Sequence, residues 1–188
     1  MADASRRLCA RVKNVDPRWL AAYAGCVLET SRRDRRLAAL FAPEAVLVPV
    51  PGSTPRRQTP WAALQLALAL NALGLGLGVW TGLRRESAVR KSATAPRAAR
   101  PSVRQHYESI SVARPMIPIH RVVLIDDVVT RGRTLLAAAA RMTTVLPRAD
   151  IRGFALIRTL GFVDRLDHLV DSCHGVVRWA GGDARREP

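Results

Sequence analysis

The chain has 188 residues, 48% of them apolar and only 5% aromatic, which suits one α/β domain with a core of Ala, Leu and Val. Lys and Arg outnumber Asp and Glu by 30 to 15, and this excess favours anionic partners: phosphorylated metabolites, nucleic acid or an acidic membrane surface. An Arg-rich but otherwise ordinary surface is the alternative explanation. The three cysteines are far apart and form no Cys-x-x-Cys pair, which argues against a disulfide scaffold or a zinc ribbon and favours a reducing, cytoplasmic setting.

The first part of the chain, residues 1–42, is predicted to form a helical extension. Asp16 followed by Pro17 is typical of a helix start, and the polar segment before it fits no signal peptide. Ser31 is predicted to cap a second helix, which ends near Phe41.

An uninterrupted apolar run at residues 45–50 predicts a first strand that is covered on both faces. The next stretch, from Trp61 to Trp80, is nearly uncharged and about long enough to cross a bilayer. Polar residues and three glycines interrupt it, so the preferred interpretation is a buried helix that begins at Thr59 and Pro60, then a turn and a short strand. No membrane association is therefore expected.

Residues 82–118 show no apolar periodicity and are predicted to form one long loop, either functional or disordered. Apolar patterning predicts the remaining elements: strands at 121–125, 151–157 and 175–179, and a helix at 134–146. Strands that alternate with helices indicate an α/β fold, with a mostly parallel sheet flanked by helices. The domain is predicted to span residues 43–180, and the polar tail at 181–188 is predicted to be loose.

The segment from Val122 to Leu135 carries the clearest chemistry. A buried strand leads into two carboxylates, Asp126 and Asp127, at the sheet edge where ligands bind in open α/β folds. Hydroxyl side chains and Gly132 follow, and then a helix begins, whose unpaired N–H groups suit a phosphate. Adjacent carboxylates repel each other unless ribose hydroxyls or a hydrated Mg²⁺ bind them.

This string resembles the phosphoribosyl pyrophosphate (PRPP) motif of type I phosphoribosyltransferases: four apolar residues, two acids, two apolar residues and Thr-x-Gly-x-Thr. The resemblance implies a Rossmann-like fold, with Asp126 and Asp127 holding the ribose hydroxyls and Mg²⁺ bound together with PRPP. It also implies that the following loop wraps the 5′-phosphate, through Val128, Val129, Thr130, Arg131, Gly132, Arg133 and Thr134.

Val48-Pro49-Val50-Pro51 before a polar loop resembles the first strand of the ComF-like branch of that family, the predicted amidophosphoribosyltransferases. The likeness covers residues 44–158, and this chain lacks the zinc ribbon with which ComF-like chains usually begin. The resemblance implies a pyrophosphate-binding loop, formed by Pro51, Gly52, Ser53, Thr54 and Arg56. A turn with solvated arginines is the alternative interpretation.

Basic residues dominate the segment that follows Leu83, with seven Lys or Arg and one acid up to Arg104. The family carries a mobile loop here that closes over PRPP and excludes water. Arg84, Arg85 and Lys91 are the candidates for such a loop, and a flexible charged loop without that role is the alternative.

The predicted reaction is Mg²⁺-dependent transfer between PRPP and a nitrogenous base or amine, with pyrophosphate released. The alternative is a non-catalytic PRPP or nucleotide sensor that binds nucleic acid through its basic surface, linked to DNA uptake or competence. The family often dimerises, which leaves a homodimer open.

Overall fold

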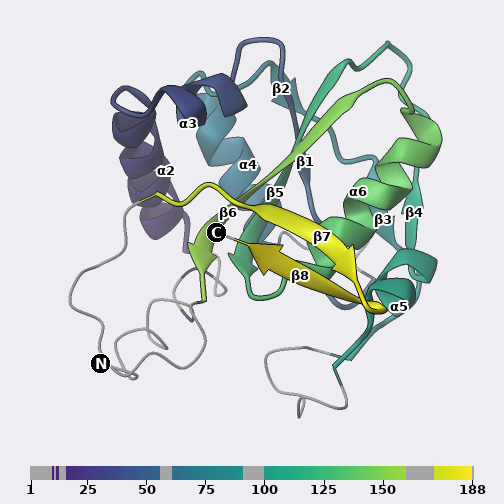
Figure 1. Ribbon diagram of the computed structural model, residues 1–188. Helices are drawn as coiled ribbons and strands as arrows, with labels where there is room; N and C mark the ends of the chain where they lie inside the picture. The colour runs from purple at the N-terminus through teal and green to yellow at the C-terminus, as the bar shows by residue number, and fades with distance from the viewer. Residues whose placement is uncertain are drawn as a thin grey trace, which may run out of the picture.

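The computed structural model describes residues 10, 12, 16–55, 61–90, 100–159 and 172–187. Four parallel strands form its central sheet in the order β2-β1-β5-β6: β2 is Gly78–Val79, β1 Val46–Pro49, β5 Arg121–Val129 and β6 Asp150–Arg158. Helices flank this sheet (Figure 1), so the predicted α/β class is confirmed and the arrangement is compatible with a Rossmann-like fold.

The two central strands bury both of their faces, as the continuous apolar run at 45–50 predicted. Val48 and Leu124 belong to one apolar cluster, whereas Leu47 and Val123 belong to the other. All four side chains are at most 1% exposed. Because successive strand residues point to opposite faces, an uninterrupted apolar sequence is what a doubly covered strand requires.

Each face of the sheet has its own cover (Figure 1). One face packs against α2 (Pro17–Ser31), α3 (Arg35–Leu40) and α4 (Ala62–Ala72). The other packs against α6 (Arg133–Val145) and a two-stranded antiparallel ribbon of β3 (Leu83–Arg85) and β4 (Ile110–Val112). The short helix α5 (Val103–Glu108) packs beside α6.

The caps of the N-terminal helices agree with the sequence in one case and differ in the other. Asp16 caps α2, where its carboxylate accepts a hydrogen bond from the N–H of Arg18. Ser31 does not cap α3: it is the last residue of α2, and its hydroxyl donates to the Leu28 carbonyl. Asp34 takes that role instead, because its carboxylate accepts from two N–H groups in the first turn of α3.

The apolar stretch at 61–80 divides into α4, a turn and β2, as predicted. Gly74 and Gly76 form the turn with φ of 82° and 75°, values that glycine adopts readily. The predicted helix start at Thr59 and Pro60 lies outside the described residues, and within them α4 begins at Ala62. None of the helices in the described ranges is long and apolar enough to span a membrane.

The prediction of one long loop at 82–118 is wrong for its described parts. Residues 83–85 and 110–112 are strands, and α5 precedes the second of them. The strands have three residues each, too few to show a periodic pattern, and their pairing joins segments far apart in the sequence.

The prediction of a loose tail is wrong as well. Strand β7 (Val176–Ala180) pairs antiparallel with β8 (Asp183–Glu187), and Gly181 and Gly182 between them both have positive φ. Such a two-residue turn matches the twist of a hairpin. Ala184 is 4% exposed and joins an apolar cluster with Ala137 of α6, which attaches this β7–β8 hairpin to the domain.

Candidate functional site

The site lies where the connections after two neighbouring strands go to opposite faces of the sheet. After β1 the chain enters α4 on one face, and after β5 it enters α6 on the other. β1 and β5 are neighbours, with Pro49 in register with Ile125. In open α/β sheets, the carboxyl ends of two such strands border the usual ligand crevice. The segment predicted to bind pyrophosphate, of which residues 51–55 are described, follows β1, and the segment predicted to bind ribose and 5′-phosphate, 126–134, begins within the end of β5.

Asp126 and Asp127 lie within the end of β5, since the strand continues to Val129 rather than ending at Ile125. The N–H of Asp127 donates to Asp126 Oδ1 and the N–H of Val128 donates to Asp127 Oδ1, both at 2.9 Å. Both residues are half-buried. The carboxylates are thus carried by a paired, regular strand.

The loop from Thr130 to Thr134 turns β5 into α6. Gly132 is the N-cap residue with φ of 81°, and no side-chain hydrogen bond caps this helix. The first helical bond runs from the N–H of Leu136 to the Gly132 carbonyl. The preceding N–H groups of the first turn have no intrahelical partner. An anion of the size of a phosphate suits this arrangement.

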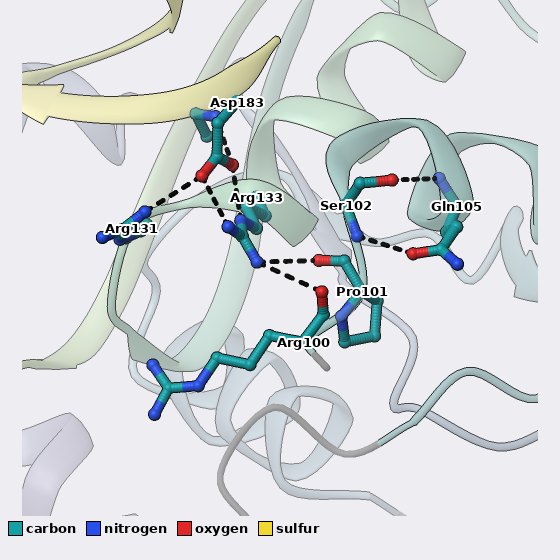
Figure 2. A network of polar contacts seen from close by, with 8 residues as sticks. Arg100, Pro101, Ser102, Gln105, Arg131, Arg133 and Asp183 are labelled. Carbon is teal, nitrogen blue, oxygen red and sulfur yellow. Dashed lines mark hydrogen bonds and ion pairs between the residues drawn. The ribbon is translucent and has the colours of Figure 1, made fainter. Parts of the chain in front are cut away.

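The arginines of this loop are already paired, a feature that the sequence did not predict (Figure 2). Arg131 Nη1 lies 3.0 Å from Asp183 Oδ2, and Arg133 donates to both carboxylate oxygens of Asp183. Arg133 Nη1 also donates to the Pro101 carbonyl at 3.1 Å. The hydrogen bonds from Arg133 lower the pKa of Asp183 to about 2, and that carboxylate raises the pKa of Arg133.

The β7–β8 hairpin therefore packs directly on the loop that precedes α6. A second contact of the hairpin is made by Arg186, whose Nη2 donates to the Thr159 carbonyl at 2.8 Å. A Cβ atom at position 132 would lie 2.7 Å from Val177 Cγ1, so only glycine fits beneath the hairpin. The Gly-Gly dipeptide at 181–182 between two short apolar or charged runs was the sequence signal for this hairpin.

The second loop, from Pro51 to Pro55, begins at a buried proline and is otherwise half-buried or exposed. Its backbone is held by the segment that starts with β3. Arg85 donates to the carbonyls of Gly52 and Pro51, and the N–H of Val89 donates to the Ser53 carbonyl. The candidate Arg56 lies outside the described residues.

The two described residues predicted for a mobile loop lie in a strand. Arg84 and Arg85 belong to β3, and Arg85 is only 5% exposed. Burial lowers the pKa of Arg85 to about 10. The assignment of Arg85 to a flexible loop is therefore wrong, because a mobile side chain cannot stay buried among fixed carbonyl groups. Lys91 lies outside the described residues.

Among the described residues of the site, Asp126 and Asp127 are the side chains that could hold a metal ion. Within the described ranges, no three or more His, Cys, Asp and Glu side chains gather as they would around a metal ion. The adjacent acids Asp126 and Asp127 suit a hydrated Mg²⁺ that takes its remaining ligands from substrate oxygens and water.

No family model matches the chain, and no curated protein matches it.

Proposed function

We propose that this chain is a type I phosphoribosyltransferase-like protein that transfers a phosphoribosyl group between PRPP and a nitrogenous base or amine. One observation carries the proposal. The connections after β1 and β5 go to opposite faces of the sheet, and at this point β5 carries two carboxylates at its end. A loop with hydroxyl side chains follows, and Gly132 joins it to a helix whose N-terminus has no side-chain cap. The groups of a sugar phosphate follow the same order as those of this segment. Its hydroxyls donate hydrogen bonds to carboxylates, and its phosphate accepts them from N–H groups.

The two loops divide the substrate between them. Asp126 and Asp127 would accept hydrogen bonds from the ribose hydroxyls, and the loop through Thr134 would hold the 5′-phosphate. The pyrophosphate would lie on the loop that follows β1, since β1 and β5 are adjacent. Mg²⁺, bound through PRPP with Asp126 and Asp127, would neutralise charge on the departing pyrophosphate.

In the proposed reaction, the bond between ribose C1 and the pyrophosphate oxygen breaks, and the electron pair leaves with pyrophosphate. The nitrogen lone pair of the acceptor forms the new bond to C1, and the acceptor nitrogen then loses a proton to water. The protein's contribution is to align the two partners and to bind the anionic leaving group. No side chain needs to form a covalent intermediate.

The first test measures Mg-PRPP binding by calorimetry in Asp126→Asn, Asp127→Asn and the double variant. We expect each single variant to weaken binding roughly ten- to a hundred-fold, and the double variant to abolish it, because charge-assisted hydrogen bonds are lost. Neighbouring strand residues point to opposite faces, so the two single variants are expected to differ in size of effect.

Asp150→Asn is the matched control for this test. Asp150 lies at the first residue of β6, at the other end of the sheet, and pairs with Arg121 and Arg152. It makes the same chemical change on the same sheet, and we expect wild-type affinity. Unchanged affinity in the double variant would refute the site.

Turnover is tested by pyrophosphate release from Mg-PRPP in the presence of a panel of nucleobases and amines. We expect release with at least one acceptor, and none with the Asp126→Asn/Asp127→Asn variant. PRPP binding without release across the panel would contradict the transfer reaction and favour a PRPP sensor.

A further inference from the structure

Arg85 is a buried cation that contacts carbonyl groups rather than a carboxylate. Its guanidinium donates to the Gly52 carbonyl at 2.8 Å, to the Pro51 carbonyl at 3.5 Å, to the His106 carbonyl at 3.4 Å and to Ser109 Oγ. Within the described ranges, no carboxylate forms an ion pair with it, and burial is what lowers its pKa. A buried charge is costly unless several dipoles point at it, so these contacts fix both the arginine and the groups around it.

These contacts set the direction of the peptide units in the loop after β1. The carbonyls of Pro51 and Gly52 point at Arg85, and the Ser53 carbonyl accepts from the N–H of Val89 at 2.8 Å. Three consecutive carbonyls therefore face the β3 segment. In a planar trans peptide the N–H points opposite to the carbonyl, so the N–H groups of Gly52, Ser53 and Thr54 face away from that segment.

These three N–H groups have no acceptor in the described part of the chain. Gly52 and Thr54 are exposed and Ser53 is half-buried, so the groups are accessible to a ligand. Successive N–H groups that are left free on one side of a loop suit an anion. The positive charge of Arg85 behind the same peptide units adds to the attraction, and it is not cancelled by a described acid.

We propose that Arg85 is a positioning residue, which orients the peptide units of Pro51–Thr54 so that their N–H groups bind the pyrophosphate part of the substrate. The inference rests on the proposed function, and it replaces a mobile-loop role for Arg85 with a fixed one. Arg85 itself is not expected to touch the pyrophosphate, because it is buried and four of its five N–H donors are used by the backbone of the loop and by the α5–β4 corner.

The test compares three probes in calorimetry: Mg-pyrophosphate, ribose 5-phosphate and Mg-PRPP. In Arg85→Gln we expect the affinity for Mg-pyrophosphate and Mg-PRPP to fall at least about tenfold, whereas that for ribose 5-phosphate changes less than about twofold. Arg85→Lys keeps the charge and is expected to recover part of the loss. This selectivity separates positioning of one loop from general damage to the fold.

Arg141→Gln is the matched control. Arg141 lies on α6 and donates from Nε to the carbonyls of Tyr107 and Ile110, at 3.0 and 2.7 Å. It thus braces the same α5–β4 corner that Arg85 contacts, without touching the loop at 51–54. We expect all three affinities to remain at the wild-type level. An equal loss for all three probes in Arg85→Gln, or no loss for Mg-pyrophosphate, would overturn the inference.

A second measurement uses the wild-type chain and so does not depend on how the variants fold. On titration with Mg-pyrophosphate, the amide NMR signals of Gly52, Ser53 and Thr54 are expected to shift together. If these signals stay in place while pyrophosphate binds elsewhere, the inference fails. If the wild type binds neither ribose 5-phosphate nor Mg-PRPP, the proposed function fails, and a pyrophosphate-induced shift of the three amides would still support the oriented loop.

Discussion

Gly132 is constrained by its own backbone and by Val177 above it. Its φ of 81° disfavours any side chain, and a Cβ atom there would lie 2.7 Å from Val177 Cγ1. We expect Gly132→Ala to lower the free energy of unfolding by about 2–4 kcal/mol, as measured by urea denaturation. In a Val177→Ala background the cost should be smaller by about 1 kcal/mol or more, because only the backbone part remains. Equal costs in both backgrounds would show that Val177 does not press on this position.

His106 connects stability to mild acid. It is 4% exposed, and neither ring nitrogen bonds to a described residue. Burial, with Arg85 and Arg133 nearby, lowers its pKa from 6.5 to about 4. Between these two values the unfolded chain binds more protons than the native one, so stability should fall as the pH drops from about 6.5 to about 4.

The free energy of unfolding that His106 contributes should fall by about 3 kcal/mol toward the acid end of that range. It is measured as the free energy of unfolding at pH 7.5, 5.5 and 4.5. In His106→Phe this part of the pH dependence should disappear. An identical slope in both proteins would assign the acid sensitivity to other groups.

At the scale of elements, the β7–β8 hairpin is too short to be stable alone and depends on its contacts with the domain, among them those of Asp183. Each strand has five residues, and an isolated hairpin of that size is at best marginally stable. We expect Asp183→Asn to speed amide hydrogen exchange throughout β7 and β8, because the contacts to Arg131 and Arg133 weaken. Glu187→Gln removes a charge from the same strand but only exposed pairs with Arg178 and Arg185, both within the hairpin, and should leave exchange nearly unchanged.

The same carboxylate gives the hairpin a dependence on strong acid. The pKa of Asp183 is lowered from 3.8 to about 2, so its contribution is present above about pH 3.8 and is lost as the pH falls toward 2. Protection of the hairpin amides in the wild type, taken relative to the intrinsic exchange rate at each pH, should therefore fall in that range and approach the protection in Asp183→Asn. Protection that stays constant down to pH 2 would mean that apolar contacts such as those of Ala184 hold the hairpin alone.

For the whole molecule, the sequence predicted what local signals determine. The cap at Asp16, the doubly buried β1 and the start of α6 near Gly132 all depend on residues close together in the chain. The β3–β4 ribbon could not be predicted in this way, because Arg85 reaches Gly52 and Pro51, 33 and 34 positions away. The sequence placed Asp126 and Asp127 at the end of a buried strand and a helix after Gly132, and the structure has both elements there. The pairing of Arg131 and Arg133 with Asp183, in contrast, depends on tertiary packing.

Net charge acts on the molecule as a whole. A charge of +15 makes the compact state repel itself, and salt shortens the range of that repulsion from about 30 Å at 0.01 M to about 10 Å at 0.1 M. We expect the thermal midpoint to rise by about 5 °C over this range of NaCl, as measured by circular dichroism. Replacing Arg33 and Arg36, both exposed, by Glu lowers the charge to +11 and should reduce the rise. A midpoint that falls with added salt would mean that attractive pairs such as Arg133–Asp183 outweigh the overall repulsion, since screening weakens both.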